Sequence, residues 1–178
     1  MKKITFMVGP SGSGKSRASK SYQEAEGIDS IIDVDEFKHQ LNEFKPLCKK
    51  TNAALHPEAS KMAKAALESF RMAGTGWVLY DSTGKDFEKV KQRAEEFKAK
   101  GFEVEFYLVE LGYINTILNV LVRNHTSNRS MLLRVVSVIW IQCKVTQIKI
   151  KRGRIPGCEV KRVQGFKRIS AFSFEGSN

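Results

Sequence analysis

The segment GPSGSGKS at residues 9–16 restricts the possible folds of this chain more strongly than any other part of the sequence. It matches the pattern GxxxxGK[ST] at every fixed position. A short apolar run, residues 4–8, comes directly before it, and a stretch with helical character, residues 14–26, opens with it. In this context the pattern predicts a phosphate-binding loop (P-loop) between a buried strand and a helix.

The chemistry of this loop predicts nucleoside triphosphate binding. Glycines allow consecutive backbone N–H groups to converge on phosphate oxygens, and the helix N-terminus adds partial positive charge. Lys15 is expected to reach the β- and γ-phosphates, and the Ser16 hydroxyl is expected to bind Mg²⁺. We therefore expect ATP, or another NTP, together with Mg²⁺, on the residues Gly9, Ser11, Gly12, Ser13, Gly14, Lys15 and Ser16.

Short apolar runs alternate with helical stretches through about residue 123. Strands are expected at 4–8, 30–34, 77–80 and 102–109, and helices at 14–26, 57–73, after Asp86, and up to Arg123. Such alternation predicts a parallel sheet with helices on both faces. The fold class is therefore α/β, a P-loop NTPase fold, and 178 residues suit one domain.

The last third of the chain has a different pattern. Residues 131–143 have helical apolar spacing, whereas 146–151, 158–163 and 167–174 resemble strands separated by glycines. We expect a P-loop core over residues 1–142, with a lid over the nucleotide site near residues 123–130. Residues 143–178 are expected to form a basic, β-rich extension of the same domain.

Positive charge is concentrated in that last third. Of the formal net charge of +11, residues 121–178 carry +10. This asymmetry favours a polyanionic partner, with DNA preferred over RNA. The side chains expected to follow a phosphate backbone are Lys144, Lys149, Lys151, Arg152, Arg154, Lys161, Arg162, Lys167 and Arg168; Phe166, Phe172 and Phe174 are candidates for base stacking.

An acidic pair follows the second expected strand. Carboxyl ends of strands face the ligand cleft in doubly wound sheets. A carboxylate there can accept the proton of an acceptor hydroxyl, so Asp35, taken as the last residue of the strand, is the predicted general base. Asp33 is more readily interpreted as a helix cap. Lys38, one helical turn further on, is expected to face the acceptor.

Two further elements complete the predicted site. Asp81 ends the third strand and is a candidate to hold Mg²⁺ through water or to orient the acceptor. Arg123 and Arg129 border a polar segment between two apolar helical stretches. Arginines on such a lid can neutralise charge on the transferring phosphoryl group. The set predicts a kinase, since neither an NKxD element nor the length of a motor ATPase is present.

The combination of GPSGSGKS, Asp35 with Lys38, the Tyr80-Asp81-Ser82-Thr83 strand end and the 123–129 segment resembles the phage-type polynucleotide 5′-hydroxyl kinases. It is more distantly similar to the zeta-toxin kinases. The resemblance covers residues 1–142. It implies that Asp35 is the general base, that Lys15 and Ser16 bind phosphate and Mg²⁺, and that a lid arginine contacts the donor.

The identity of the acceptor stays open at this point. The first hypothesis is an ATP-dependent kinase acting on nucleic acid, at a 5′-hydroxyl or at a hydroxyl of a modified base. The alternative is a small-molecule kinase of the zeta-toxin or nucleoside-kinase type, and a third possibility is a nucleotide-gated nucleic-acid-binding module. Scattered cysteines and the short first apolar run favour a cytoplasmic protein without disulfides or a membrane span.

Overall fold

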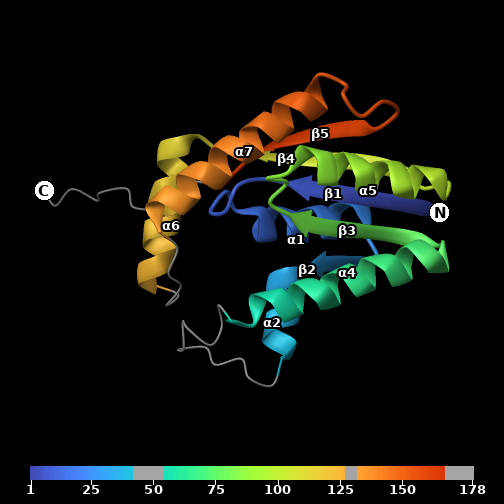
Figure 1. Cartoon of the computed structure of the whole chain (residues 1–178), viewed down its shortest axis with the longest axis horizontal. Coiled ribbons are helices and arrows are strands. Elements are labelled where there is room, and N and C mark those ends of the chain that lie inside the picture. The colour runs from blue at the N-terminus through green and yellow to red at the C-terminus, as the bar shows by residue number, and fades with distance from the viewer. Residues whose placement is uncertain (42–53, 127–131, 167–178) are drawn as a thin grey trace, which may run out of the picture.

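A five-stranded parallel sheet forms the centre of the computed structural model, which describes residues 1–41, 54–126 and 132–166 (Figure 1). The spatial order of the strands is β2-β3-β1-β4-β5, and every neighbouring pair is parallel. The strands are β1 (Lys2–Val8), β2 (Ser30–Asp33), β3 (Gly76–Ser82), β4 (Glu103–Glu110) and β5 (Glu159–Gln164).

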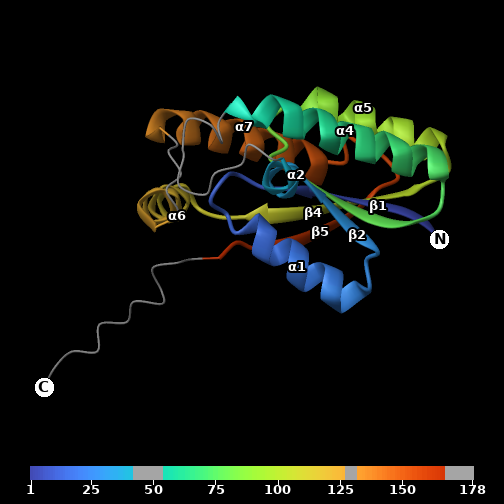
Figure 2. The ribbon, with the colours of Figure 1, turned by 90° about the horizontal axis from the view of Figure 1, so that it is seen from below.

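Helices cover both faces of this sheet, which confirms the α/β prediction. Figure 2 shows α1 alone below the sheet and α4, α5 and α7 above it. The helices are α1 (Lys15–Glu26), α2 (Val34–Gln40), α4 (His56–Ala73), α5 (Phe87–Ala99), α6 (Tyr113–Thr126) and α7 (Leu133–Lys151).

The buried strand β1 explains why the first apolar run is continuous. Ile4, Phe6 and Val8 belong to the core cluster beneath α4, α5 and α7. Met7 points to the other face, where it packs with Tyr22 of α1. A strand buried on both faces needs apolar residues at nearly every position, unlike one with a solvated face.

The segment expected as a strand at residues 146–151 is instead the end of α7, so that prediction is wrong. Its β-branched residues favour strand, but intrinsic propensity is a weak determinant when packing opposes it. Cys143, Gln147 and Ile150 recur at helical spacing and are all buried against the sheet. That buried face decides the conformation.

Strand β5 shows how the first part of the expected β-rich extension joins the rest of the domain. The strand expected at 158–163 forms as β5, but it pairs with β4 as the fifth strand of the central sheet. The expected division after residue 142 falls inside α7. Residues 143–164 are thus part of the core, whereas the strand expected at 167–174 lies outside the described residues.

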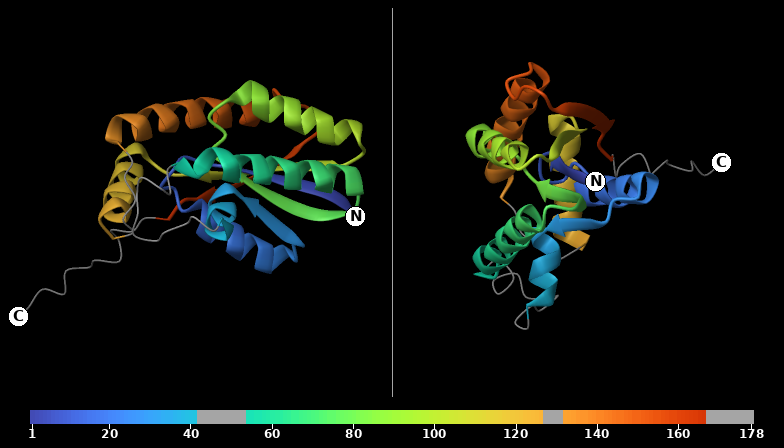
Figure 3. Two further views of the ribbon diagram at one scale, coloured as in Figure 1. Left: turned by 60° about the horizontal axis from the view of Figure 1, so that its bottom comes forward. Right: turned by 90° about the vertical axis from the view of Figure 1, so that its right-hand side faces the viewer.

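The carboxyl ends of β1, β2 and β3 meet at one edge of the sheet (Figure 3). Parallel register places Val8 beside Ser82 and Asp33 beside Asp81. The P-loop leaves β1 at this edge and leads into α1. Over the described ranges, no helix is both long enough and apolar enough to cross a bilayer.

Candidate active site

Two glycines of the P-loop adopt a backbone conformation that other residues avoid. Gly12 has φ +85° and Gly14 has φ +86°. A Cβ atom on Gly12 would lie 2.7 Å from Cγ2 of Val120, and one on Gly14 would lie 2.8 Å from Cβ of Phe166. Both positions therefore require glycine, for conformation and for space.

Gly12→Ala is expected to lower the free energy of unfolding by about 2–4 kcal/mol, because left-handed strain and an overpacked contact with Val120 act together. Gly27→Ala is the matched control. Gly27 has φ +69° but no atom within 4 Å of the added Cβ, so only strain of about 1 kcal/mol is expected. Urea denaturation measures the free energy of unfolding of both variants. Equal losses would show that the contact with Val120 does not contribute to the effect of Gly12→Ala.

Lys15 and Ser16 lie where the loop opens into helix α1. The Lys15 ammonium donates a hydrogen bond to the carbonyl oxygen of Pro10, 3.3 Å away, and Ser16 is exposed in the first turn. The lysine thus folds over its own loop, and the hydroxyl is accessible from the carboxyl edge.

Two carboxyl groups lie near this lysine, the buried Asp81 and the partly buried Asp33. Asp81 is 7% exposed, and the Ser19 hydroxyl donates to it over 3.5 Å. Burial raises the pKa of Asp81 to about 7; the positive charge of Lys15 opposes the rise, and the negative charges of Asp33 and Asp35 add to it. Burial also raises the pKa of Asp33. These two carboxyl groups therefore keep their protons to a higher pH than usual.

These oxygens fit Mg²⁺, which prefers carboxylate, hydroxyl and phosphate ligands. Asp81 and the Ser16 hydroxyl would hold it, with Asp33 adjacent, and the ion would favour the ionised form of these carboxyl groups and neutralise phosphate oxygens. In the part of the chain that the structure describes, no three His, Cys, Asp or Glu side chains gather as a metal site. Water and phosphate oxygens would thus fill the remaining coordination positions of the ion.

The ligand-free protein is expected to lose stability as pH rises from about 4 to 7. The unfolded state ionises Asp81 near its ordinary value of 3.8, whereas the folded state resists ionisation until about 7. That difference in pKa corresponds to a loss of roughly 4 kcal/mol in the free energy of unfolding, which is complete above pH 7. Asp81→Asn should flatten the profile, measured as thermal stability against pH. An unchanged profile in Asp81→Asn would show that the raised pKa of Asp81 is not the cause of the pH dependence.

Asp35 does not end the strand, which corrects the sequence expectation. Strand β2 ends at Asp33, whose carboxylate accepts a hydrogen bond of 2.9 Å from the backbone N–H of Asp35 and caps α2. Asp35 lies in the first turn of α2. Its carboxylate pairs with the Lys38 ammonium at 2.7 Å and is 42% exposed. The structure thus brings together Asp35 and Lys38, as the spacing predicted.

Sequence reasoning missed two residues beside this pair. His56 opens α4, and its pKa is lowered by burial and by the charges of Lys38 and Lys85, while Asp35 opposes the shift. Neither His56 nor Lys85 belongs to a motif. Their proximity follows from the crossover connections, so no local pattern could have identified them.

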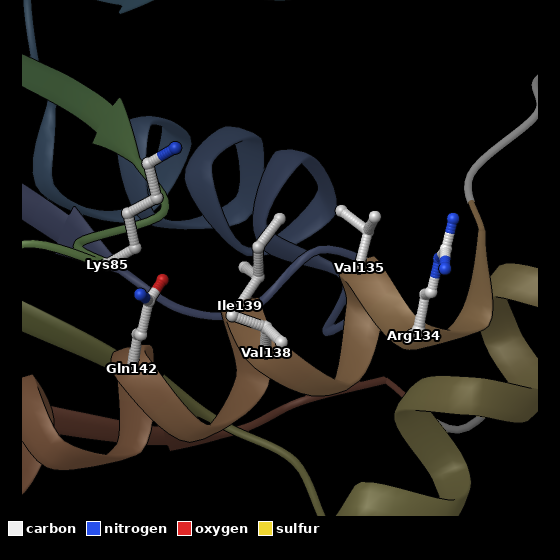
Figure 4. A pocket seen from close by; sticks show the side chains of 6 residues that line it. All are labelled: Lys85, Arg134, Val135, Val138, Ile139 and Gln142. Atoms are coloured by element: carbon white, nitrogen blue, oxygen red, sulfur yellow. The ribbon is translucent and has the colours of Figure 1, made fainter.

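A cavity of about 390 Å³ opens next to Lys85. Figure 4 shows Lys85 and Arg134 near its two ends, with apolar side chains of α7 between them. The lining residues are Lys85, Arg134, Val135, Val138, Ile139 and Gln142. Two cations around an apolar wall suit a ligand that carries negative charge on a less polar body.

The expected lid is only partly described. Arg123 lies near the end of α6 and is half-buried. Arg129 lies outside the described residues, so its contact with the donor phosphates stays a prediction.

Several basic side chains of the last third interact within the protein. Lys151 pairs with Glu110 at the end of β4. Lys161 of β5 lies 3.3 Å from the buried Glu105 and donates to the Tyr22 hydroxyl over 2.8 Å. These lysines hold α7 and β5 against the core, which reduces the charge available to a nucleic acid.

Sequence comparison gives a consistent result for this chain. The model of the zeta toxin family, described as "Zeta toxin", matches residues 1–168. The toxin zeta of Enterococcus hirae is 31% identical over 126 residues, which cover 68% of this chain and 44% of the relative, and that of Streptococcus pyogenes matches equally. The chain thus spans less than half the length of these curated relatives.

Solved structures show the same fold. A structure from the PezAT toxin–antitoxin system of Streptococcus pneumoniae has a TM-score of 0.71 at 21% identity and covers 92% of this chain and 67% of its own. A gluconokinase from Sinorhizobium meliloti has a TM-score of 0.55 at 18% identity, covering 96% and 86%. At these identities the likeness establishes the P-loop kinase fold.

Proposed function

The chain belongs to the zeta toxin family, and we propose that it is a kinase that transfers the γ-phosphoryl group of ATP to a hydroxyl of a small molecule. One observation carries the proposal. The P-loop, the buried Asp81 and the Asp35–Lys38 pair share one edge of the sheet. Membership of this family makes a small molecule, rather than nucleic acid, the main hypothesis for the acceptor.

Each group has a defined task in this proposal. The P-loop N–H groups and Lys15 bind the triphosphate, and Mg²⁺, when bound, offsets charge on the phosphate oxygens. Asp35 accepts the proton of the acceptor hydroxyl as that oxygen attacks the γ-phosphorus in line, and the bond from the γ-phosphorus to the bridging oxygen breaks to release ADP. Lys38 orients the Asp35 carboxylate through their 2.7 Å ion pair. Arg123 and Arg129 are proposed to contact the donor phosphates.

The cavity beside Lys85 supports a small, negatively charged acceptor. Zeta toxins phosphorylate UDP-sugars. A nucleotide sugar combines a diphosphate, suited to a cation at one end of the cavity, with rings suited to the apolar wall of α7. Its sugar hydroxyls are the acceptor groups. ATP as the donor also accords with the cytoplasmic location expected from the sequence.

A hydroxyl on nucleic acid remains the second candidate acceptor. It is favoured by Arg152, Arg154 and Arg162, which are exposed near β5 and are not needed for nucleotide binding. Their arrangement would attract a polyanion in a salt-dependent manner. The engaged lysines Lys151 and Lys161 weaken this alternative.

Transfer of label from γ-³²P-ATP distinguishes these acceptors. We expect transfer to UDP-sugars, with free sugars, nucleosides, 5′-hydroxyl DNA and RNA, and base-modified duplex as the comparison panel. Lys15→Met, assayed in parallel, excludes a contaminating kinase. Transfer to nucleic acid alone would overturn the small-molecule assignment, and ATP-dependent DNA binding without any transfer would overturn the kinase assignment.

A further inference from the structure

A buried amide holds the outer side of the P-loop. Asn119 of α6 is 4% exposed. Its Nδ2 atom donates to the carbonyl oxygen of Gly12 over 2.8 Å and to that of Phe166 over 2.6 Å. An amide nitrogen has two hydrogens, so one side chain satisfies both carbonyls. Asn119 thereby joins the loop to the segment that follows β5.

That segment lies directly on the loop. The Phe166 N–H donates to the carbonyl oxygen of Ser13 over 3.0 Å, and the Gly165 N–H donates to that of Glu110 over 2.6 Å. A Cβ on Gly165 would lie 2.5 Å from the Ser13 oxygen. The close approach therefore depends on glycine at this position.

These contacts set the orientation of two peptide groups in the loop. In a planar trans peptide the C=O and N–H bonds point in opposite directions. Because the Ser13 carbonyl faces Phe166, the Gly14 N–H faces away from it. The next peptide back is held at both ends, since Asn119 binds the Gly12 carbonyl and the Ser13 N–H donates to Pro10 over 3.1 Å.

We propose that Asn119 is a positioning residue that preorganises the P-loop for the triphosphate. It touches no substrate; it acts through the Gly12 and Phe166 carbonyls. A loop whose donors are already oriented loses less conformational entropy when the anion binds. The inference rests on the proposed nucleotide binding and adds a residue outside the GPSGSGKS pattern that sets its affinity.

Asn119→Asp tests this with little change of shape. The carboxylate has no hydrogen to donate and faces two carbonyl oxygens. Loss of both bonds is expected to raise the Kd and KM for ATP by about 10- to 100-fold. The kcat at saturating ATP should stay within about threefold of wild type, because no reacting group is touched. Titration with a fluorescent ATP analogue and initial rates measure this split.

Gln23→Ala is the matched control. Gln23 makes the same kind of bond, from Nε2 to the carbonyl oxygen of Ile28 over 3.1 Å, at the far end of α1. Its loss should lower stability without changing the Kd for ATP.

A second pair of variants, at Phe166, tests the inference if Asn119→Asp does not fold. Phe166→Pro removes the N–H that binds the Ser13 carbonyl, whereas Phe166→Ala retains it and loses only the ring. We expect the proline variant to bind ATP at least about tenfold more weakly than the alanine variant. Wild-type affinity in both Asn119→Asp and Phe166→Pro would overturn the inference and leave the proposed function intact. A wild-type chain that binds no ATP would overturn both.

Discussion

Replacing Asp35 with asparagine is expected to lower kcat for phosphoryl transfer by about 10²- to 10⁴-fold, the usual contribution of a general base. Asparagine keeps the size of the side chain but cannot take up the acceptor proton. The P-loop is untouched, so the affinity for ATP should change little. Single-turnover rates at saturating ATP and acceptor, compared with ATP titrations, separate the two effects.

Asp33→Asn is the matched control for that substitution. Asp33 caps α2 by accepting the Asp35 N–H, and asparagine caps helices about as well as aspartate. Its kcat should therefore fall much less. A large loss in Asp33→Asn with near-normal activity in Asp35→Asn would assign the base to Asp33, which ends β2 beside Asp81.

Lys15→Met is expected to lower kcat/KM by at least about 10²-fold. The variant lacks the positive charge that the folded loop holds beside the transferring phosphoryl group. Methionine is also unbranched and apolar along its stem, so the loop should still fold. Lys15 further offsets the negative charge of Asp33 and Asp81. The variant should therefore raise the pKa of Asp81 and shift the stability–pH profile to higher pH.

Lys20→Met, on the exposed face of the same helix, is the control for general loss of charge. It should retain kcat/KM within about twofold, since exposed charges far from a site contribute little. Retention of kcat/KM within tenfold in Lys15→Met would contradict the assigned role of Lys15. An unshifted pH profile would show that Lys15 and Asp81 are not electrostatically coupled.

The local elements of this fold were predictable because short-range chemistry specifies them. Gly27 ends α1 with a left-handed φ of +69°, and Asp86 caps α5 by accepting the Lys89 N–H. The 9–16 pattern identified both its strand and its helix. By contrast, residues 146–151 were assigned to a strand, because their β-branched composition is local whereas the buried face that makes them helical is not.

Local patterns specify the P-loop, the α/β class and the candidate carboxylates, since each depends on residues within a few positions of one another. Which of these groups meet depends on the tertiary structure. Parallel register places Asp33 beside Asp81, crossover connections bring His56 and Lys85 to the Asp35–Lys38 pair, and β5 carries Phe166 back onto the loop that Asn119 holds. Such proximities arise from the strand order 2-3-1-4-5, which pairs strands that are about 50 to 100 residues apart and leaves no signal in local spacing.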